Sequence, residues 1–260
     1  MPTIAFMTAN YVARETGWAM RDWDHGDRAT QERFRPLDTY AERLEEVLEN
    51  AHALGFDTVD VWGAHLHPAW ATDGHVAAAR EVLERVGLRV ATYATWLDPS
   101  NVERACELAR GLGTDLIGAG FSGEPEDLVP ALRERGVRLA VENHPEKNPA
   151  EVLAKIERGA GSLGATVDTG WWGTQGYDAA RAIEELGDRV LHVHLKDVQA
   201  VGEPHVTCPW GEGVVDISAC VDVLRRTGYQ GAVTIEHEPE DHDPSDEIGE
   251  LRRRLEAWLG

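Results

Sequence analysis

The sequence predicts one (β/α)8 barrel that spans residues 1–260. Short apolar segments of strand length alternate with helical segments along the whole chain, and no linker or low-complexity segment interrupts them. Eight strict alternations with right-handed crossovers leave this barrel as the strongest candidate. The 260 residues also match the roughly 250 of a typical barrel. A doubly wound open sheet is the alternative, but no GxGxxG motif follows the first strand.

The first unit is the least regular. Thr3–Ala9 is predicted to be a strand, and apolar residues recur with helical period over Thr39–Leu54 before Gly55, the expected C-cap. The polar stretch between them, Asn10–Asp38, is too long for an ordinary connection. We expect it to be either a lid over one end of the barrel or an irregular surface excursion. Its aromatic and imidazole side chains include Trp18, Trp23 and His25.

The same unit then repeats seven times, and a glycine follows most of the helices. The expected strands are Thr58–Trp62, Arg89–Thr95, Leu116–Gly118, Arg138–Glu142, Leu163–Asp168, Val190–Lys196 and Ala232–Glu236. The expected helices are Val76–Val86, Val102–Leu112, Glu126–Arg135, Pro149–Arg158, Tyr177–Leu186, Ile217–Thr227 and Asp246–Leu259.

Composition restricts the functions that remain. The net charge of −21 argues against nucleic acid or an anionic membrane as a partner, because both bind through basic surfaces. No run approaches the roughly 18 apolar residues of a membrane span, and the N-terminal sequence lacks the basic region of a secretory signal. Cys106, Cys208 and Cys220 are widely spaced and form no CxxC pair. We therefore expect a cytoplasmic protein with reduced thiols.

One strand segment, Arg189–Asp197 (RVLHVHLKD), separates two kinds of side chain. Read with period two, one face carries Leu191, Val193 and Leu195, and the other carries His192, His194 and Lys196. The apolar face should pack against helices. The basic and metal-capable side chains on the opposite face then need partners inside the barrel.

Three other strand segments supply such partners, because each begins with apolar residues and ends near a carboxylate. These segments are Leu139–His144, Ala165–Gly170 and Val233–Glu238. The carboxyl ends of barrel strands face the catalytic mouth, and carboxylates gathered there would repel one another without a cation. Oxygen ligands with one imidazole suit Mn²⁺, Co²⁺ or Mg²⁺ better than structural zinc. The expected ligand set is Glu142, Asp168, His194 and Glu236.

Five motifs carry a resemblance to a known family. They are VENH (Val141–His144), VDTG (Val167–Gly170), HVHLKD (His192–Asp197), GEG (Gly211–Gly213) and IEHE (Ile235–Glu238). With them the chain resembles the xylose isomerase-like TIM barrels, a superfamily of sugar isomerases and epimerases. The resemblance implies that Glu142, Asp168, His194 and Glu236 bind one divalent metal ion, Mn²⁺ above all. It also implies that Glu142 and Glu236 lie on opposite faces of a small sugar or polyol and move its proton.

Two departures from the family pattern leave the substrate open. Trp171 and Ala200 stand where many ketose 3-epimerases of the family have a histidine and an arginine that bind or polarise the sugar. Lys196, on the inward face just past His194, could supply a replacement cation. Epimerisation, isomerisation and loss of a β-substituent all begin with removal of a proton beside a carbonyl. The resemblance therefore also admits a lyase similar to inosose dehydratases or C-glycoside-cleaving enzymes.

Six side chains near strand ends are expected to contact the substrate: Trp62, His65, His144, Trp171, Lys196 and Glu212. His65 and His67 form an HxH pair far from the metal set, so substrate contact by one of them is favoured over metal ligation. Sugars stack on tryptophan rings, but tryptophans at a barrel rim often only pack loops. Glu212 could equally be a turn residue between glycines.

Two further functions are disfavoured. An abasic-site endonuclease of the same superfamily would need several zinc ions, more histidines and an attraction for a polyanion, which the negative charge opposes. An inactive sugar-binding barrel would not need a complete ligand set. The sequence leaves open whether the protein is a homo-oligomer.

Overall fold

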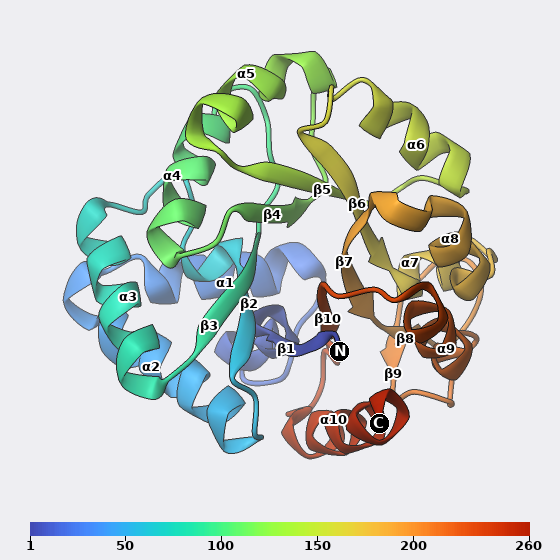
Figure 1. The fold of residues 1–260 in the computed structure, drawn as a ribbon. Coiled ribbons are helices and arrows are strands. Elements are labelled where there is room, and N and C mark those ends of the chain that lie inside the picture. Colours follow the sequence, from blue (N-terminus) through green and yellow to red (C-terminus); the bar gives the residue numbers. More distant parts are fainter.

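The computed structural model describes residues 1–260 and contains a closed barrel of parallel strands inside a ring of helices (Figure 1). The barrel strands are β1 (Thr3–Met7), β2 (Thr58–Trp62), β3 (Arg89–Ala94), β4 (Leu116–Ala119), β5 (Arg138–Glu142), β6 (Leu163–Asp168), β7 (Val190–Leu195) and β10 (Ala232–Ile235). Successive barrel strands pair with one another, and β1 closes the barrel against β10. The predicted (β/α)8 fold is confirmed.

The helices between the strands lie close to their predicted positions. They are α2 (Leu37–Ala53), α3 (Asp73–Val86), α4 (Val102–Leu112), α5 (Pro125–Arg135), α6 (Pro149–Glu157), α8 (Ala179–Leu186), α9 (Ile217–Thr227) and α10 (Ser245–Leu259). Gly87 and Gly113 end α3 and α4 in left-handed backbone with φ of 82° and 90°, as the glycine pattern predicted. None of the helices is both long and apolar enough to cross a membrane.

The stretch 10–38 is more ordered than an irregular excursion, and that part of the expectation is wrong. It contains helix α1 (Trp23–Phe34) after two 3-10 turns, Thr8–Tyr11 and Arg14–Thr16. Asp22 caps α1 by accepting a hydrogen bond from the backbone N–H of His25. Only Gly26, Thr30 and Phe34 of this helix are buried, so its apolar period is too weak to recognise in the sequence.

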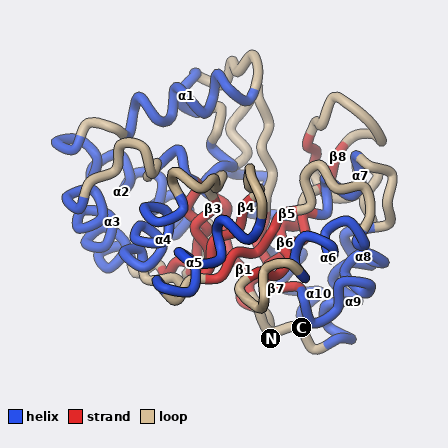
Figure 2. Tube along the Cα trace, turned by 90° about the horizontal axis from the view of Figure 1, so that it is seen from above, coloured by secondary structure: helices blue, strands red, loops and turns tan.

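Two insertions after β6 and β7 extend the mouth of the barrel. The first is the short helix α7 (Thr169–Thr174), and the second is an antiparallel ribbon of β8 (Asp197–Val198) and β9 (Thr207–Cys208). Figure 2 shows α1 and β8 at the same end of the barrel, away from both termini. This end is the one at which the barrel strands finish.

The ribbon is held by one buried carboxylate. Asp197 accepts hydrogen bonds from the backbone N–H groups of Val198, Gly211, Gly213 and Val215, at 2.9–3.1 Å. A side chain at position 213 would collide with the backbone of Val198 and the Asp197 carboxylate, which explains a glycine there. The GEG motif is therefore an anchor for the loop after β7.

The two faces of the barrel strands differ as the alternation predicted. The outward residues Val141, Val167, Val193 and Ile235 belong to the main hydrophobic core under the helices. The inward face is unusually polar, with Asp60, Thr92, Thr166, His192 and Thr234 all fully buried. A barrel interior is ordinarily filled by branched apolar residues. Buried polar groups need partners, so the interior below the mouth is a hydrogen-bonded layer.

Candidate active site

Four side chains converge where β5, β6, β7 and β10 end. Glu142, Asp168, His194 and Glu236 each offer a possible ligand atom, and these atoms all lie within 4.8 Å of one another. The Nδ1 atom of His194 is 3.1 Å from Glu142 Oε1 and 3.0 Å from Glu236 Oε2. Asp168, His194 and Glu236 are buried, whereas Glu142 is half-buried. The structure thus brings together the side chains that the sequence selected.

Strand register and one asparagine fix this convergence. Asp168 pairs with His194 across β6 and β7, so both side chains leave the sheet at the same level. Just past β5, the Asn143 side chain accepts a hydrogen bond from the Asp168 N–H at 2.7 Å and donates one to the Asp168 carbonyl at 2.9 Å. Asp168 Oδ1 accepts the N–H of Trp171 and caps α7. Its second oxygen is left to face the cluster.

The donor set fits a divalent cation. Asp168 Oδ2 and Glu236 Oε2 are buried and make no well-aligned hydrogen bond, and their nearest polar neighbours are cationic or imidazole nitrogens: Lys196 Nζ at 3.3 Å and His194 Nδ1 at 3.0 Å. Burial raises the pKa of Asp168 to about 7; Lys196 opposes that shift, and the charges of Glu236 and Glu142 add to it. Several carboxylates gathered in one buried site repel one another, and a divalent cation relieves that repulsion. Three carboxylates and an imidazole are the ligands that Mn²⁺, Co²⁺ or Mg²⁺ accept.

Lys196 lies among the same carboxylates. Its Nζ is 3.3 Å from Asp168 Oδ2, 3.2 Å from Glu236 Oε1 and 2.9 Å from Glu238 Oε2. Burial alone would lower the pKa of Lys196, but Asp168, Glu236 and Glu238 raise it well above its ordinary value. Lys196 is therefore a fixed cation. A Cβ at Gly170 would meet its side chain at 2.7 Å, so the glycine of VDTG gives the lysine room.

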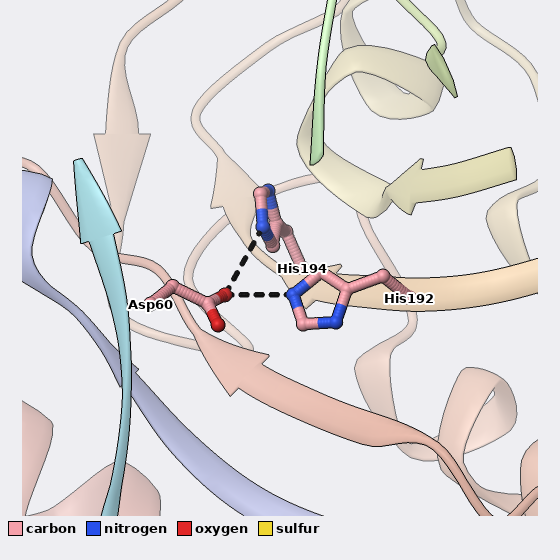
Figure 3. A group of neighbouring side chains, drawn as sticks. All are labelled: Asp60, His192 and His194. Atoms are coloured by element: carbon pink, nitrogen blue, oxygen red, sulfur yellow. Dashed lines mark hydrogen bonds and ion pairs between the residues drawn. The ribbon is translucent and has the colours of Figure 1, made fainter. Parts of the chain in front are cut away.

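A second buried group lies below the cluster, inside the barrel (Figure 3). Asp60 of β2 and His192 of β7 are fully buried, and His192 Nε2 is 2.7 Å from Asp60 Oδ2. The same oxygen is 3.4 Å from Nε2 of His194. Burial raises the pKa of Asp60, but the contacts with His192 and His194 outweigh it and hold that pKa below its ordinary value. No role for His192 was predicted, and Asp60 was not predicted at all, because its only signal was a carboxylate in an apolar strand.

Three rings stack beside the cluster. His144 and Trp171 lie 3.7 Å apart between centroids at 11°, and Trp171 and His205 lie 3.9 Å apart at 16°. Imidazoles cover both faces of Trp171, so only the edge of this ring can meet a substrate. His205, which the sequence analysis missed, comes from the loop between β8 and β9, and its Nδ1 is 2.7 Å from Thr174 Oγ1. No local sequence pattern marks a contact between loops so far apart.

The opposite side of the mouth is aromatic. Trp62 is half-buried and packs edge-on against Trp23 of α1 at 5.5 Å and against His65 at 5.6 Å. His65 is buried, packs on Phe34 and lies 3.2 Å from Thr8 Oγ1 through its Nδ1. In this structure His65 is a core residue. Its contact with a substrate, like that of Trp62, stays a prediction.

Two further positions lie outside the cluster. Glu212 is exposed in the turn after β9, where its N–H bonds to the Pro209 carbonyl, and its substrate contact stays a prediction. Trp210 is buried and stacks on Trp258 at 6.0 Å, so this tryptophan packs α10 against the loop.

Comparisons with known proteins agree with this architecture. Residues 48–258 match the family model described as xylose isomerase-like TIM barrel. An uncharacterized protein of Methanocaldococcus jannaschii, MJ1311, is 26% identical over 142 residues, 50% of this chain and 47% of that protein. The match thus spans about half the length of that relative. A putative hydroxypyruvate isomerase of Streptomyces coelicolor is 23% identical over 244 residues, 75% of this chain and 85% of its own.

A solved structure of L-ribulose 3-epimerase superposes with a TM-score of 0.73 at 18% identity, covering 100% of this chain and 95% of the other. At this identity the likeness shows the fold.

Proposed function

Because the chain belongs to the xylose isomerase-like TIM barrel family, we propose that it is a divalent-metal-dependent isomerase or epimerase of a small carbonyl sugar or polyol. The observation that carries this proposal is the convergence of Glu142, Asp168, His194 and Glu236 within 4.8 Å. The putative hydroxypyruvate isomerase and the L-ribulose 3-epimerase among its relatives and structural neighbours support the reaction class.

The four converging side chains would hold one divalent ion, with Mn²⁺ first and Co²⁺ or Mg²⁺ as alternatives. Bound there, the ion would polarise a substrate carbonyl and acidify the neighbouring C–H bond. Asp168 and His194 are the more enclosed ligands and fix the site. Glu142 and Glu236 approach from β5 and β10, on the two sides of His194, and can also face the substrate.

The two glutamates carry the proton in this proposal. Lys196 and His194 overcome the effect of burial on Glu236 and hold its pKa well below the ordinary value, so this carboxylate is ionised and free to accept a proton. One glutamate takes the proton beside the carbonyl, and the other returns a proton from the opposite face. Return to the same carbon gives the epimer, and return to the neighbouring carbon gives the isomer.

Lys196 stabilises the enediolate that proton removal leaves. Its ammonium group is 3.2 Å from Glu236 Oε1, so it lies beside the place where negative charge develops. Glu238 holds Lys196 from the other side at 2.9 Å. His144 and the edge of Trp171 are next to these groups, and Trp62 faces them from the aromatic side; these side chains would bind the rest of the substrate.

A lyase that uses the same first step is the alternative. It needs an acid to protonate a leaving group at the β-carbon, and His144 and His205 are the imidazoles near the cluster. Burial lowers the pKa of His144, and it lowers the pKa of His205 to about 3. Both rings are therefore neutral at pH 7 and poorly prepared to donate a proton. This favours rearrangement over elimination.

The test is incubation with a panel of ketoses, 3-keto-sugars and inososes in D₂O, with Mn²⁺ and with a chelator. We expect deuterium in an isomeric product of unchanged formula, formed only with the metal. A product whose mass is lower than that of the substrate by one water or one aglycone would show that the protein is a lyase. Turnover that survives complete metal removal would overturn the proposed function.

A further inference from the structure

A carboxylate that the proposed reaction does not use lies directly under the proposed metal site. Asp60 is fully buried in the middle of β2, and its Oδ2 faces Nε2 of both His192 and His194 (Figure 3). Burying a charged carboxylate costs free energy of folding, because the charge loses its contact with water. The position of Asp60 therefore needs an explanation.

We propose that Asp60 is a positioning residue that sets the tautomer and ring orientation of His194, so that Nδ1 of His194 points into the metal site. This inference rests on the proposed metal-dependent function. It assigns a role to the barrel interior that neither the motifs nor the family comparison indicates.

The two nitrogens of His194 have different surroundings. Nδ1 is 3.1 Å from Glu142 Oε1 and 3.0 Å from Glu236 Oε2, among the other candidate ligands. Nε2 is 3.4 Å from Asp60 Oδ2 and has no hydrogen-bond partner. A nitrogen that binds a metal must present its lone pair, so the ring proton has to be on the other nitrogen. A carboxylate beside Nε2 favours that tautomer and turns the ring.

Asp60 is itself fixed by contacts that cross the barrel. Its Oδ1 accepts the backbone N–H of Thr92 at 3.1 Å, and its Oδ2 is 2.7 Å from His192 Nε2. Thr234 Oγ1 lies 3.2 Å from the same nitrogen of His192. Residues of β3 and β7 thus hold the Asp60 carboxylate directly, and Thr234 of β10 contacts its partner His192.

The backbone is irregular at both ends of this contact. The pairing of β2 with β3 shifts register between Val59 and Asp60, and the pairing of β6 with β7 shifts between Ala165 and Thr166, so that Thr166 lies opposite His192. A bulge re-aims the side chains next to it. Asp60 and His192 each come directly after such a shift in strand pairing.

A second metal ion is the competing explanation, because possible ligand atoms of Asp60, His192 and His194 also lie within 4.8 Å of one another. However, the 2.7 Å between Asp60 Oδ2 and His192 Nε2 is a hydrogen-bond distance. Both side chains are also fully enclosed. Direct contact is therefore the better explanation, and the stoichiometry of binding decides between the two.

The experiment is titration calorimetry with Mn²⁺ on the unaltered protein, on Asp60→Asn and on Asp188→Asn, whose side chain is 98% exposed. We expect one ion per chain, and about 10- to 100-fold weaker binding for Asp60→Asn alone. Equal affinity of Asp60→Asn and the unaltered protein would overturn the inference and leave the proposed function standing. Binding of two ions per chain would show that Asp60, His192 and His194 form a second metal site, and would overturn the positioning role. No binding by the unaltered protein would overturn both proposals.

Asparagine at a buried site can also impair folding, so a second measurement uses the unaltered chain. With diamagnetic Zn²⁺ bound, long-range ¹H–¹⁵N spectra report which nitrogen of His194 carries the proton. We expect Nε2–H. An Nδ1–H tautomer in the loaded protein would overturn the role of Asp60. A merely structural role for Asp60 would lower the melting temperature of the metal-free variant without changing its Mn²⁺ affinity.

Discussion

The side of the barrel mouth formed by β5, β6, β7 and β10 carries ionisable side chains, whereas the side formed by β1 and β2 carries aromatic rings. On the first side, Glu142, Asp168, His194 and Glu236 gather around one point, with Lys196 against them. On the second, Trp62 and Trp23 pack edge-on over His65 and Phe34. The charged side gathers carboxylates that the proposed metal ion would join, whereas the aromatic side is held together by ring contacts.

This difference separates two tasks in the proposed enzyme. Substitutions on the charged side should change metal binding and turnover. Substitutions on the aromatic side and in the ring stack should change substrate binding or stability and leave the metal site intact. The following predictions test that separation.

The largest effect should follow from removing an enclosed ligand. Asp168→Asn and His194→Ala should each lose the metal and reduce activity to background, because neither replacement restores the missing donor. Metal content after dialysis, with activity at added Mn²⁺, measures this. Asp188→Asn, on an exposed turn, is the control. Variants that keep both the metal and their activity would show that the cluster is not the metal site.

Replacing either proposed proton carrier should cost somewhat less. Glu142→Gln and Glu236→Gln should each lower turnover by roughly 10²-fold or more, the typical contribution of a positioned acid or base. Circular dichroism should hardly change, because residues at a barrel mouth seldom hold the fold. The matched control is Glu240→Gln, which alters an exposed carboxylate on the same segment. Glu238→Gln is compared with both variants, because Glu238 is the other buried glutamate of this segment. If only Glu238→Gln were inactive, the assignment of the base would be wrong.

A smaller effect is expected in the ring stack. Trp171→Ala removes the ring between His144 and His205 and should raise KM by roughly 10-fold, in line with the ~0.5–1.5 kcal/mol of an aromatic pair. Mn²⁺ affinity should not change. Trp96→Ala, at a ring that is 50% exposed, is the control. Weaker Mn²⁺ binding by Trp171→Ala would show that the stack supports Asp168 rather than the substrate.

The smallest effect should come from the aromatic side, as a dependence of stability on pH. Burial lowers the pKa of His65 from 6.5 to about 3, so below pH 6.5 the unfolded chain takes up a proton that the folded protein does not. The free energy of unfolding should therefore fall by up to about 1.4 kcal/mol per pH unit on acidification. His65→Gln should reduce this slope between pH 6.5 and 4 in urea titrations. A slope equal to that of the control, His52→Gln, would contradict the prediction.

The charged side of the mouth was also the part that the sequence could predict. Its candidate ligands stand in short motifs at strand ends, and the period of two assigns them to the inward face without any knowledge of distant contacts. The barrel itself followed from eight repeated units. Helix α1 was missed because its buried residues are few and two of them are Gly26 and Thr30.

The remaining features depend on contacts between residues far apart in the chain. Asp60 and His192 are separated by 132 positions, and only closure of the barrel brings them together. The stack on Trp171 joins helix α7 to the loop after β5 and to the loop between β8 and β9, so the position of a tryptophan after a strand did not reveal that both faces of its ring are covered. His65 resembled a ligand in its HxH motif, but the unpredicted helix α1 covers it with Phe34.

The carboxylate of Asp197 has a consequence for how this enzyme could diversify. Because it binds the N–H groups of Val198, Gly211, Gly213 and Val215, it ties both ends of the loop at its base. The intervening segment 199–206, which carries His205, is therefore anchored at its base by contacts outside the segment itself. Lys196 and His194 precede this anchored base in the chain, so we expect substitutions within the segment to leave them in place. New substrate preferences could therefore arise in this one segment while the proton-transfer chemistry stays the same.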